Sequence, residues 1–302
     1  MVQKRSRTVS LRPMPSKPTE ADPSAPAPRS GTLAVRIVRA GLERRTDEAD
    51  RVAVEAPLEI QLHHPAFGAE PMPFGATMRT PGDDAALAAG LLYGEGLIQS
   101  ATDIEAIETS TRRPNVVNVR VQAAVALAIP AAVRRFSAGS ACGVCGTTGL
   151  DAAIARAAAT RIAPGAAADL AVLLALPRRM RESQSKFGLT GGIHAAALFD
   201  YSGAMLGLAE DVGRHNALDK LVGENLLGGR LPLANRIVVL SGRASFELVQ
   251  KALRAGVSIL AAIGAPSSLA VQLSAASGLT LVGFLRDAHC NIYTHAERLR
   301  GP

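Results

Sequence analysis

Cys142 and Cys145 are the residues whose type and spacing point most directly to chemistry. They form a Cys-x-x-Cys pair within a glycine-rich segment at residues 139–149. Residues 150–159 are dominated by alanine and predict a helix, for which Thr148 is a suitable N-cap. A thiol directly ahead of a helix N-terminus is stabilised as the thiolate, which is the nucleophilic form of sulfur. The segment therefore predicts a reactive cysteine.

Three kinds of site use such a pair: half of a zinc site, a dithiol redox couple, or a nucleophile that handles sulfur. A closed zinc site needs four ligands, but there is no second Cys-x-x-Cys, and His194, His289 and Cys290 come singly from distant turns. A zinc deaminase also needs His-x-Glu or Cys-x-Glu, which is absent ahead of the pair. A thioredoxin-type couple fits the alanine-rich residues 120–141 poorly. We expect no bound metal.

The charge and composition of the chain limit the classes of partner that we expect for it. Residues 1–30 hold six Lys and Arg against two Asp and Glu, a balance of +4 out of the net +7. This stretch is also rich in Pro, Ser and Ala, so we predict a disordered basic tail at residues 1–32 and no nucleic-acid partner. Three cysteines make no disulfide framework and indicate a reducing cytoplasm. No apolar run reaches the ~18–20 residues that span a bilayer, so no membrane segment is expected.

The ordered part of the chain divides into two predicted domains. The first, at residues 33–135, reads as a small α+β unit with strands at 33–38, 50–62 and 116–121 and a helix at 85–93. The second occupies residues 136–302. It begins with the cysteine segment and continues with a hairpin of strands at 195–200 and 205–210 and a helix at 217–227.

The last third of the chain alternates between buried strands and helices. The strands are expected at 236–240, 257–263 and 279–285, and the helices at 244–254 and 269–277. This β-α-β-α-β order with short glycine turns predicts a parallel, doubly wound α/β sheet.

Polar turns follow the three strands of that predicted sheet. They contain Ser241, Gly242 and Arg243, then residues 264–268, then residues 286–289. Ligands of open parallel sheets bind at the carboxyl ends of the strands, and free N–H groups at helix N-termini there favour anions. Arginine side chains in these turns could bind phosphate. The alternative is that the turns are ordinary connections of an α/β sheet.

Several segments in this order resemble the formate dehydrogenase accessory sulfurtransferase family (FdhD/NarQ). The resemblance covers about residues 35–300, and its motifs lie at residues 140–146, 190–194, 210–220, 241–245, 280–286 and 291–293. It implies a carboxy-terminal domain similar to the α/β/α cytidine deaminase fold without its metal. It also implies a homodimer.

The resemblance further implies a sulfur relay. Members of the family take persulfide sulfur from a cysteine desulfurase and pass it to the bis(molybdopterin guanine dinucleotide) molybdenum cofactor that is destined for formate dehydrogenase. The persulfide cysteine maps onto Cys142, with Cys145 as its partner. The family's cofactor-binding stretch maps onto Phe284, Leu285, Arg286, Asp287, Ala288 and His289. We add Ser241, Gly242 and Arg243 as candidate cofactor-binding residues, because they form the polar turn after the first of the parallel strands.

Two other functions stay open at this point. One is a chaperone that binds the molybdenum cofactor without transferring sulfur, and the other is a zinc-binding protein of the deaminase type. The roles of Cys145 relative to Cys142, and those of Cys290, His194 and His215, are also open. For both histidines a packed structural role competes with a role in acid–base chemistry.

Overall fold

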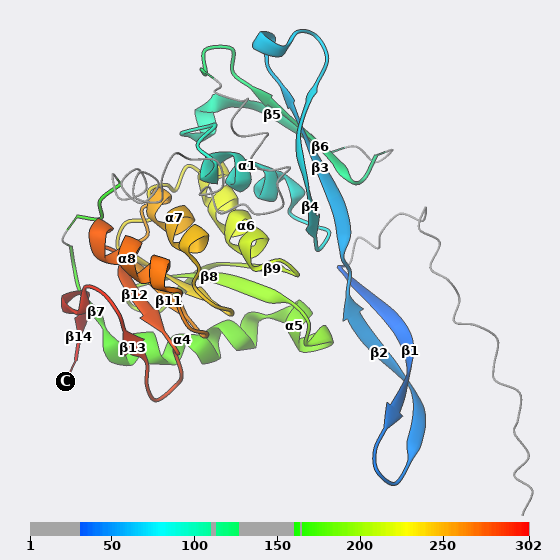
Figure 1. Ribbon diagram of the computed structural model, residues 1–302, viewed down its shortest axis with the longest axis vertical. Helices are drawn as coiled ribbons and strands as arrows, with labels where there is room; N and C mark the ends of the chain where they lie inside the picture. Colours follow the sequence, from blue (N-terminus) through cyan, green and yellow to red (C-terminus); the bar gives the residue numbers. More distant parts are fainter. Residues whose placement is uncertain (1–30, 110–112, 127–159, 164, 302) are drawn as a thin grey trace, which may run out of the picture.

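The computed structural model describes residues 31–109, 113–126, 160–163 and 165–301 (Figure 1). Residues 1–30 of the tail predicted at 1–32, the cysteine segment with Cys142 and Cys145, the helix expected at 150–159 and the predicted domain boundary at residue 135 lie outside the described residues. The end of the predicted tail is ordered, because the first strand begins at Thr32. The boundary stays a prediction.

A six-stranded sheet forms the larger half of the protein. Its strand order is β13-β12-β11-β10-β8-β9. The three central strands run parallel: β10 (Arg236–Leu240), β11 (Ile259–Ala262) and β12 (Thr280–Gly283). The antiparallel hairpin of β8 (His194–Asp200) and β9 (Met205–Asp211) extends one side, and β13 (Asn291–Ile292) closes the other. The predicted α/β class and the parallel β-α-β-α-β unit are confirmed.

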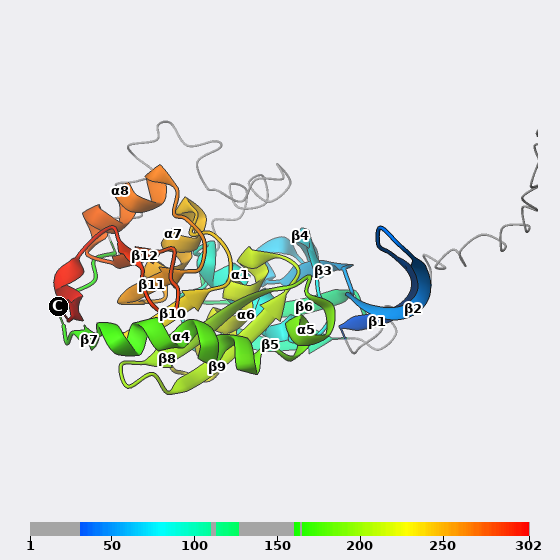
Figure 2. The same ribbon diagram turned by 90° about the horizontal axis from the view of Figure 1, so that it is seen from below.

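Helices cover both faces of this sheet. On one face lie α6 (Arg214–Leu227), α7 (Phe246–Arg254) and α8 (Ser268–Ser277), and on the other lies α4 (Leu170–Ser183) (Figure 2). Alternate residues of β10 serve the two cores: Val238 packs with the helices of the first face, and Val239 packs with α4. None of the described helices is long and apolar enough to cross a membrane.

Ser245 and Ser267 begin two of these helices. Their hydroxyl groups accept hydrogen bonds from the backbone N–H groups of Leu248 and Ala270 at 3.5 and 3.3 Å, so each serine is an N-cap. In α4, Leu173, Leu176 and Met180 recur at helical spacing and face the sheet. The short elements are α5 (Ser185–Thr190), β7 (Ala168–Asp169), β14 (Leu299–Arg300) and 3-10 helices at Pro65–Phe67, Ala101–Asp103 and Ala296–Arg298.

A second sheet of four strands belongs to the amino-terminal part of the chain. Its order is β4-β3-β6-β5, formed by β3 (Ala56–His63), β4 (Met72–Arg79), β5 (Ile104–Thr109) and β6 (Val116–Val121), and it packs with α1 (Asp84–Gly94). The hairpin of β1 (Thr32–Ala40) and β2 (Arg45–Ala53) projects from the body (Figure 1).

The single strand expected at residues 50–62 is wrong. The chain leaves the hairpin at Ala53 and enters the four-stranded sheet at Ala56, so the stretch is two strands in two sheets. Apolar residues alternate from the end of β2 through the corner into β3, at Val52, Val54, Leu58 and Ile60. A period of two marks strand conformation but not the corner between sheets.

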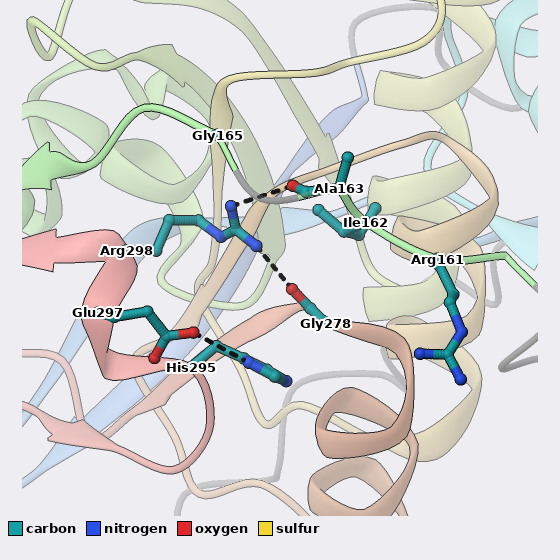
Figure 3. A pocket seen from close by; sticks show the side chains of 8 residues that line it. All are labelled: Arg161, Ile162, Ala163, Gly165, Gly278, His295, Glu297 and Arg298. Carbon is teal, nitrogen blue, oxygen red and sulfur yellow. Dashed lines mark hydrogen bonds and ion pairs between the residues drawn. The ribbon is translucent and has the colours of Figure 1, made fainter.

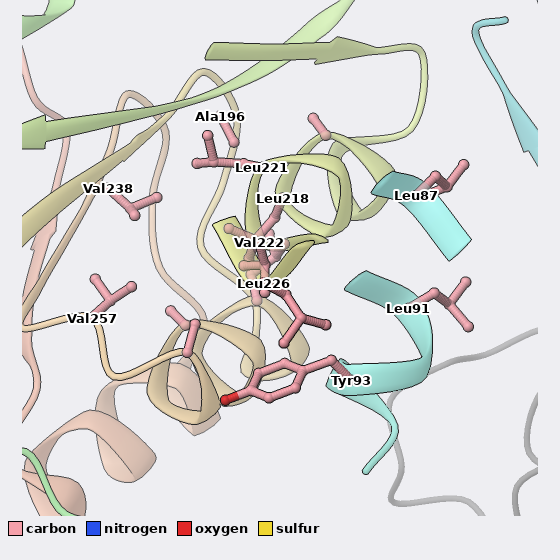
Figure 4. Close-up of a cluster of buried hydrophobic side chains, with 14 of the residues drawn as sticks. Leu87, Leu91, Tyr93, Ala196, Leu218, Leu221, Val222, Leu226, Val238 and Val257 are labelled. Carbon is pink, nitrogen blue, oxygen red and sulfur yellow. The ribbon is translucent and has the colours of Figure 1, made fainter. Parts of the chain in front are cut away.

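The two halves of the chain meet through α1 and α6, which pack glycine against backbone. A Cβ atom on Gly90 would lie 1.9 Å from the carbonyl oxygen of Asp219, and one on Gly223 would lie 1.8 Å from that of Ala86. Figure 4 shows the apolar side chains around this contact, which include Leu87, Leu91 and Tyr93 of α1 and Leu218, Val222 and Leu226 of α6. One continuous core therefore joins the amino-terminal unit to the larger sheet.

Gly223→Ala tests this contact. Because the added methyl group would meet backbone and not a flexible side chain, α1 and α6 must separate, and we expect a loss of about 3 kcal/mol or more in the free energy of unfolding. Gly188→Ala is the matched control, since a Cβ there meets nothing within 4 Å. Urea unfolding of both variants measures the difference, and equal stabilities would show that the helices do not depend on the glycine contact.

Candidate functional site

A pocket of about 830 Å³ opens where the predicted polar turns meet α4. Ser241 follows β10, Ile263 follows β11, and Leu285 to His289 follow β12, so the carboxyl ends of all three parallel strands contribute to its lining. Of the predicted cofactor residues, the pocket brings together Ser241, Leu285, Arg286, Asp287, Ala288 and His289. Phe284, Gly242 and Arg243 are not among the residues that line it.

The turn after β12 is anchored to the end of β11 where it begins, and it is closed by a hydrogen bond of its own. Phe284 takes a left-handed backbone conformation (φ 51°) and exposes its ring, whereas Leu285 is fully buried. Their backbone N–H groups donate to the carbonyl oxygens of Gly264 (3.1 Å) and Ala262 (3.0 Å). The N–H of Arg286 donates to the carbonyl oxygen of His289 at 2.9 Å and closes the turn. The side chains of the turn are thus presented by a fixed backbone.

Arg286 carries its charge at the rim of this pocket. Its Nη1 donates to the carbonyl oxygens of Ile263 (2.6 Å) and Leu285 (2.8 Å), which ties the turn to the end of β11. Within the described residues Arg286 has no carboxylate partner, so its positive charge stays available to a ligand. Such an arrangement suits a phosphate-bearing molecule.

α4 contributes Arg178 and Arg181 to the pocket, two residues that the sequence analysis does not identify. The guanidinium carbon of Arg181 lies 3.9 Å from the ring centre of Phe187, a stacking contact that fixes the side chain without neutralising it. The only signal in the sequence is a basic cluster beside the apolar spacing of Leu173, Leu176 and Met180. Arg178 and Arg181 lie in the site because α4 crosses the sheet edge.

His194 lies in a smaller adjoining pocket that shares Ser241 and Arg181 with the larger one. The Ser241 hydroxyl accepts from the N–H of Ala195 at 2.8 Å and lies 3.4 Å from Nδ1 of His194. Burial, followed by the nearby charge of Arg214, lowers the pKa of His194. The ring is therefore neutral at physiological pH, and the structure places it at the site instead of in the core.

Two carboxylates at the end of β9 hold the elements that surround this pocket in place. Glu210 accepts hydrogen bonds from the N–H groups of Lys186 (3.0 Å) and Phe187 (2.8 Å), so it caps the first turn of α5. Asp211 is completely buried and forms an ion pair with Lys220 at 2.8 Å. The motif at residues 210–220 therefore holds elements together through its acidic residues.

A second cluster of polar side chains joins the N-termini of α6 and α7. Nε2 of His215 lies 3.3 Å from the Ser245 hydroxyl and 3.5 Å from a carboxyl oxygen of Glu247. Lys251 pairs with both carboxyl oxygens of Asp219 at 2.5 and 2.7 Å and lies 3.7 Å from Glu247. Burial raises the pKa of Glu247 to about 7, and burial followed by nearby positive charge lowers that of His215 to about 3. At neutral pH the contact between them is consequently not an ion pair.

A third pocket of about 440 Å³ lies beside the C-terminus of α8 (Figure 3). Arg298 donates to the carbonyl oxygens of Ala163 (3.3 Å) and Gly278 (2.9 Å), and Nε2 of His295 lies 3.1 Å from the carbonyl oxygen of Ala275. Arg161 lines the pocket as well. His295 and Arg298 satisfy carbonyl groups at the end of α8, which explains their place in the cluster as a helix cap.

No group of three or more His, Cys, Asp or Glu side chains suited to hold a metal ion occurs within residues 31–109, 113–126, 160–163 and 165–301. Cys142 and Cys145 are outside these ranges, so the absence of a metal at the cysteine pair stays a prediction. Cys290 is half-buried, and burial raises the pKa of its thiol, which disfavours the thiolate.

Known proteins resemble this chain over most of its length. A model of the FdhD/NarQ family matches residues 53–300. The chain belongs to the FdhD/NarQ family. It is 46% identical over 258 residues to a sulfur carrier protein FdhD of Streptomyces avermitilis, covering 83% of this chain and 89% of that protein. It is 40% identical over 272 residues to a sulfur carrier protein FdhD of Saccharolobus solfataricus, covering 88% and 100%.

A solved structure has a similar fold. It belongs to a protein of Desulfotalea psychrophila assigned as a formate dehydrogenase accessory protein, with a TM-score of 0.67 and 25% identity over 89% of this chain and 99% of the other. The expected family and fold class are confirmed. The individual site residues stay predictions, because a family match does not test them one by one.

Glu247→Gln tests the electrostatics of the cluster at α6 and α7. The folded chain retains the carboxyl proton up to about pH 7, whereas the unfolded chain loses it near the ordinary value of 4.5. The folded state therefore binds more protons between these values, and the wild type loses stability as the pH rises through them. Relative to wild type, the variant should gain on the order of 2–3 kcal/mol between pH 5 and pH 8.

Urea unfolding at the two pH values measures this gain, with Glu224→Gln as a control on an exposed carboxylate of α6. The control should differ equally from wild type at both values. An equally constant difference for Glu247→Gln would mean that Glu247 ionises at its ordinary pKa and that its burial has no electrostatic consequence.

Proposed function

We propose that this protein is a sulfur carrier that receives persulfide sulfur on Cys142 from a cysteine desulfurase. It transfers this sulfur to the bis(molybdopterin guanine dinucleotide) cofactor, which is the acceptor substrate, before the cofactor enters formate dehydrogenase. The observation that carries the proposal is the joint presence of a Cys-x-x-Cys segment and a basic pocket at the sheet edge in a chain whose relatives are named sulfur carrier proteins.

Sulfur transfer at Cys142 follows from thiolate chemistry. The Cys142 thiolate attacks the outer sulfur of the desulfurase persulfide, whose S–S bond breaks as its own cysteine leaves with the electron pair. Cys142 then holds the outer sulfur as a persulfide. In delivery a nucleophilic centre of the acceptor donates an electron pair to the outer sulfur and forms a bond to it, the S–S bond to Cys142 breaks, and Cys142 leaves as the thiolate, so the acceptor supplies the two electrons. Each step conserves electrons and needs no metal of the protein's own.

The larger pocket supports the second half of the proposal. A guanine dinucleotide carries a diphosphate and a planar base, and the pocket offers Arg178, Arg181 and Arg286 toward negative oxygen atoms. Asp287 is exposed in the same lining and supplies a carboxylate that can accept from the N–H groups of guanine. The residues present therefore fit a guanine nucleotide in charge and hydrogen-bonding capacity.

Arg286→Ala tests the nucleotide site, with GDP as the probe. Loss of a charge-assisted hydrogen bond costs roughly 1.5–3 kcal/mol, so GDP should bind about ten- to a hundredfold more weakly. Arg243→Ala removes the same kind of charge outside the pocket lining and should change binding little. Calorimetry of both variants decides, and GDP affinity that survives Arg286→Ala would place the nucleotide elsewhere.

Cys142→Ser tests the sulfur-carrying step. After incubation with a cysteine desulfurase and cysteine, intact-mass measurement should show one added sulfur atom on the wild type and none on the variant. Cys290→Ser is the matched control and should load normally. If Cys142→Ser still supports formate dehydrogenase maturation, the protein is a cofactor chaperone without a sulfur-transfer step, which is the alternative function.

A further inference from the structure

Phe284, Ile292 and Tyr293 form an exposed apolar corner of the six-stranded sheet. Phe284 follows β12, and Ile292 belongs to β13, whose residues pair with Val282 and Gly283 of β12 (Figure 1). The Tyr293 ring lies close to Gly283, since a Cβ atom on this glycine would be 3.0 Å from Cε2 of the ring. The three residues are 40, 36 and 37% exposed and line none of the pockets described above. We refer to them as the apolar corner.

Phe284 takes a backbone conformation that disfavours its own side chain. Its φ of 51° is positive, and the other non-glycine residues with positive φ within the described ranges are Asp83, Asn235 and His295. Asp, Asn and His are enriched in the left-handed region, whereas a bulky apolar residue is an outlier there. Such strain persists chiefly at functional sites. The ring of Phe284 is thus kept at a position where glycine would be the less strained residue.

The composition of the corner is that of a protein-binding surface. Phe284 and Tyr293 are the two most exposed aromatic side chains in the part of the chain that the structure describes. Arg286, Asp287 and His289 follow Phe284 in the same turn and are exposed as well, so polar residues border the apolar ones. Protein interfaces combine an apolar, aromatic centre with a polar rim, and a few central aromatic residues carry most of the binding energy.

The position of the corner favours one partner. Leu285 to His289 directly follow Phe284 and line the larger pocket, so a protein bound to the apolar corner lies beside that pocket. In the proposed function the desulfurase has to reach Cys142, whereas formate dehydrogenase has to take the cofactor from the pocket. Formate dehydrogenase is therefore the partner that gains from binding at this place.

We infer that the apolar corner is the docking surface for formate dehydrogenase that lacks its cofactor, with the rings of Phe284 and Tyr293 at the centre of the contact. The identity of the partner rests on the proposed function, whereas the use of the corner as a protein-binding surface does not. Docking beside the pocket lets the cofactor pass from one protein to the other without release into solvent.

Binding of the full chain to formate dehydrogenase without cofactor tests this surface. In biolayer interferometry Phe284→Gly and Tyr293→Ala should each weaken the affinity about tenfold or more, because truncation of a central aromatic residue has an effect of this size. Leu206→Ala is the matched control and should bind like the wild type. This leucine is 46% exposed on β9, the strand at the opposite end of the sheet order.

Phe284→Ala separates the loss of the ring from the relief of backbone strain. Both variants of Phe284 lack the ring and should bind formate dehydrogenase equally weakly. Glycine alone accepts a positive φ freely, so Phe284→Gly should unfold about 2–4 °C above Phe284→Ala. A lower midpoint for the glycine variant would contradict the strained conformation from which the inference starts.

Calorimetry with GDP and sedimentation velocity separate docking from other uses of the corner. Docking predicts that Phe284→Gly and Tyr293→Ala keep the GDP affinity and the oligomeric state of the wild type. A loss of GDP affinity would show that the rings contact the nucleotide, and a smaller oligomer would show that a second copy of the chain covers the corner. Either result overturns the inference, as does unchanged binding of formate dehydrogenase.

Persulfide loading of wild-type Cys142, measured in parallel, keeps this inference apart from the proposed sulfur relay. If loading fails while formate dehydrogenase binding depends on Phe284 and Tyr293, the docking surface stands and the relay fails. If loading succeeds while both variants bind formate dehydrogenase normally, the relay stands and the docking surface fails.

Discussion

The completely buried carboxylate of Asp211 is the constraint on which the rest of this structure depends. It accepts hydrogen bonds from the backbone N–H groups of Thr80 (3.1 Å) and Gly213 (2.9 Å), from the amide of Asn216 (3.1 Å), and pairs with Lys220. A buried charge is stable only when it is paired and fully hydrogen-bonded, as here. Through these contacts Asp211 fixes the start of α6 to the end of β9 and both to the chain that enters α1.

The neighbouring Glu210 extends that constraint to the functional site. By capping α5 it sets the position of Phe187, which holds Arg181 between the two pockets. Two adjacent acidic residues on one strand thus serve different elements, because successive side chains of a strand point to opposite faces. One joins the halves of the molecule, and the other positions the side chain of Arg181 between the two pockets.

Local sequence was sufficient for much of the fold. The strands predicted at 116–121 and 236–240 coincide with β6 and β10, since each is a compact run of β-branched residues. α4 was not predicted, because Pro177 interrupts its helical pattern and its amphipathic face has meaning only against the sheet. The contact between Gly90 and Gly223 joins residues too distant in sequence for any local pattern to show.

Some residues of the candidate site could also be predicted from the sequence, and others could not. The polar turns after three parallel strands predicted a shared edge, because strand direction alone brings those turns together, and Ser241 and Arg286 do line one pocket. Arg178 and Arg181 depend on how α4 crosses that edge. Which donors a ligand meets is thus decided by packing between helix and sheet.

A single-turnover transfer tests the central claim most directly. The chain is loaded with ³⁵S-labelled persulfide, freed of desulfurase and cysteine, and mixed with molybdenum cofactor and formate dehydrogenase that lacks it. A sulfur relay predicts that the label leaves this chain and is recovered with the cofactor in formate dehydrogenase, in proportion to the activity gained. Activity that appears while the label remains on this chain would contradict the relay.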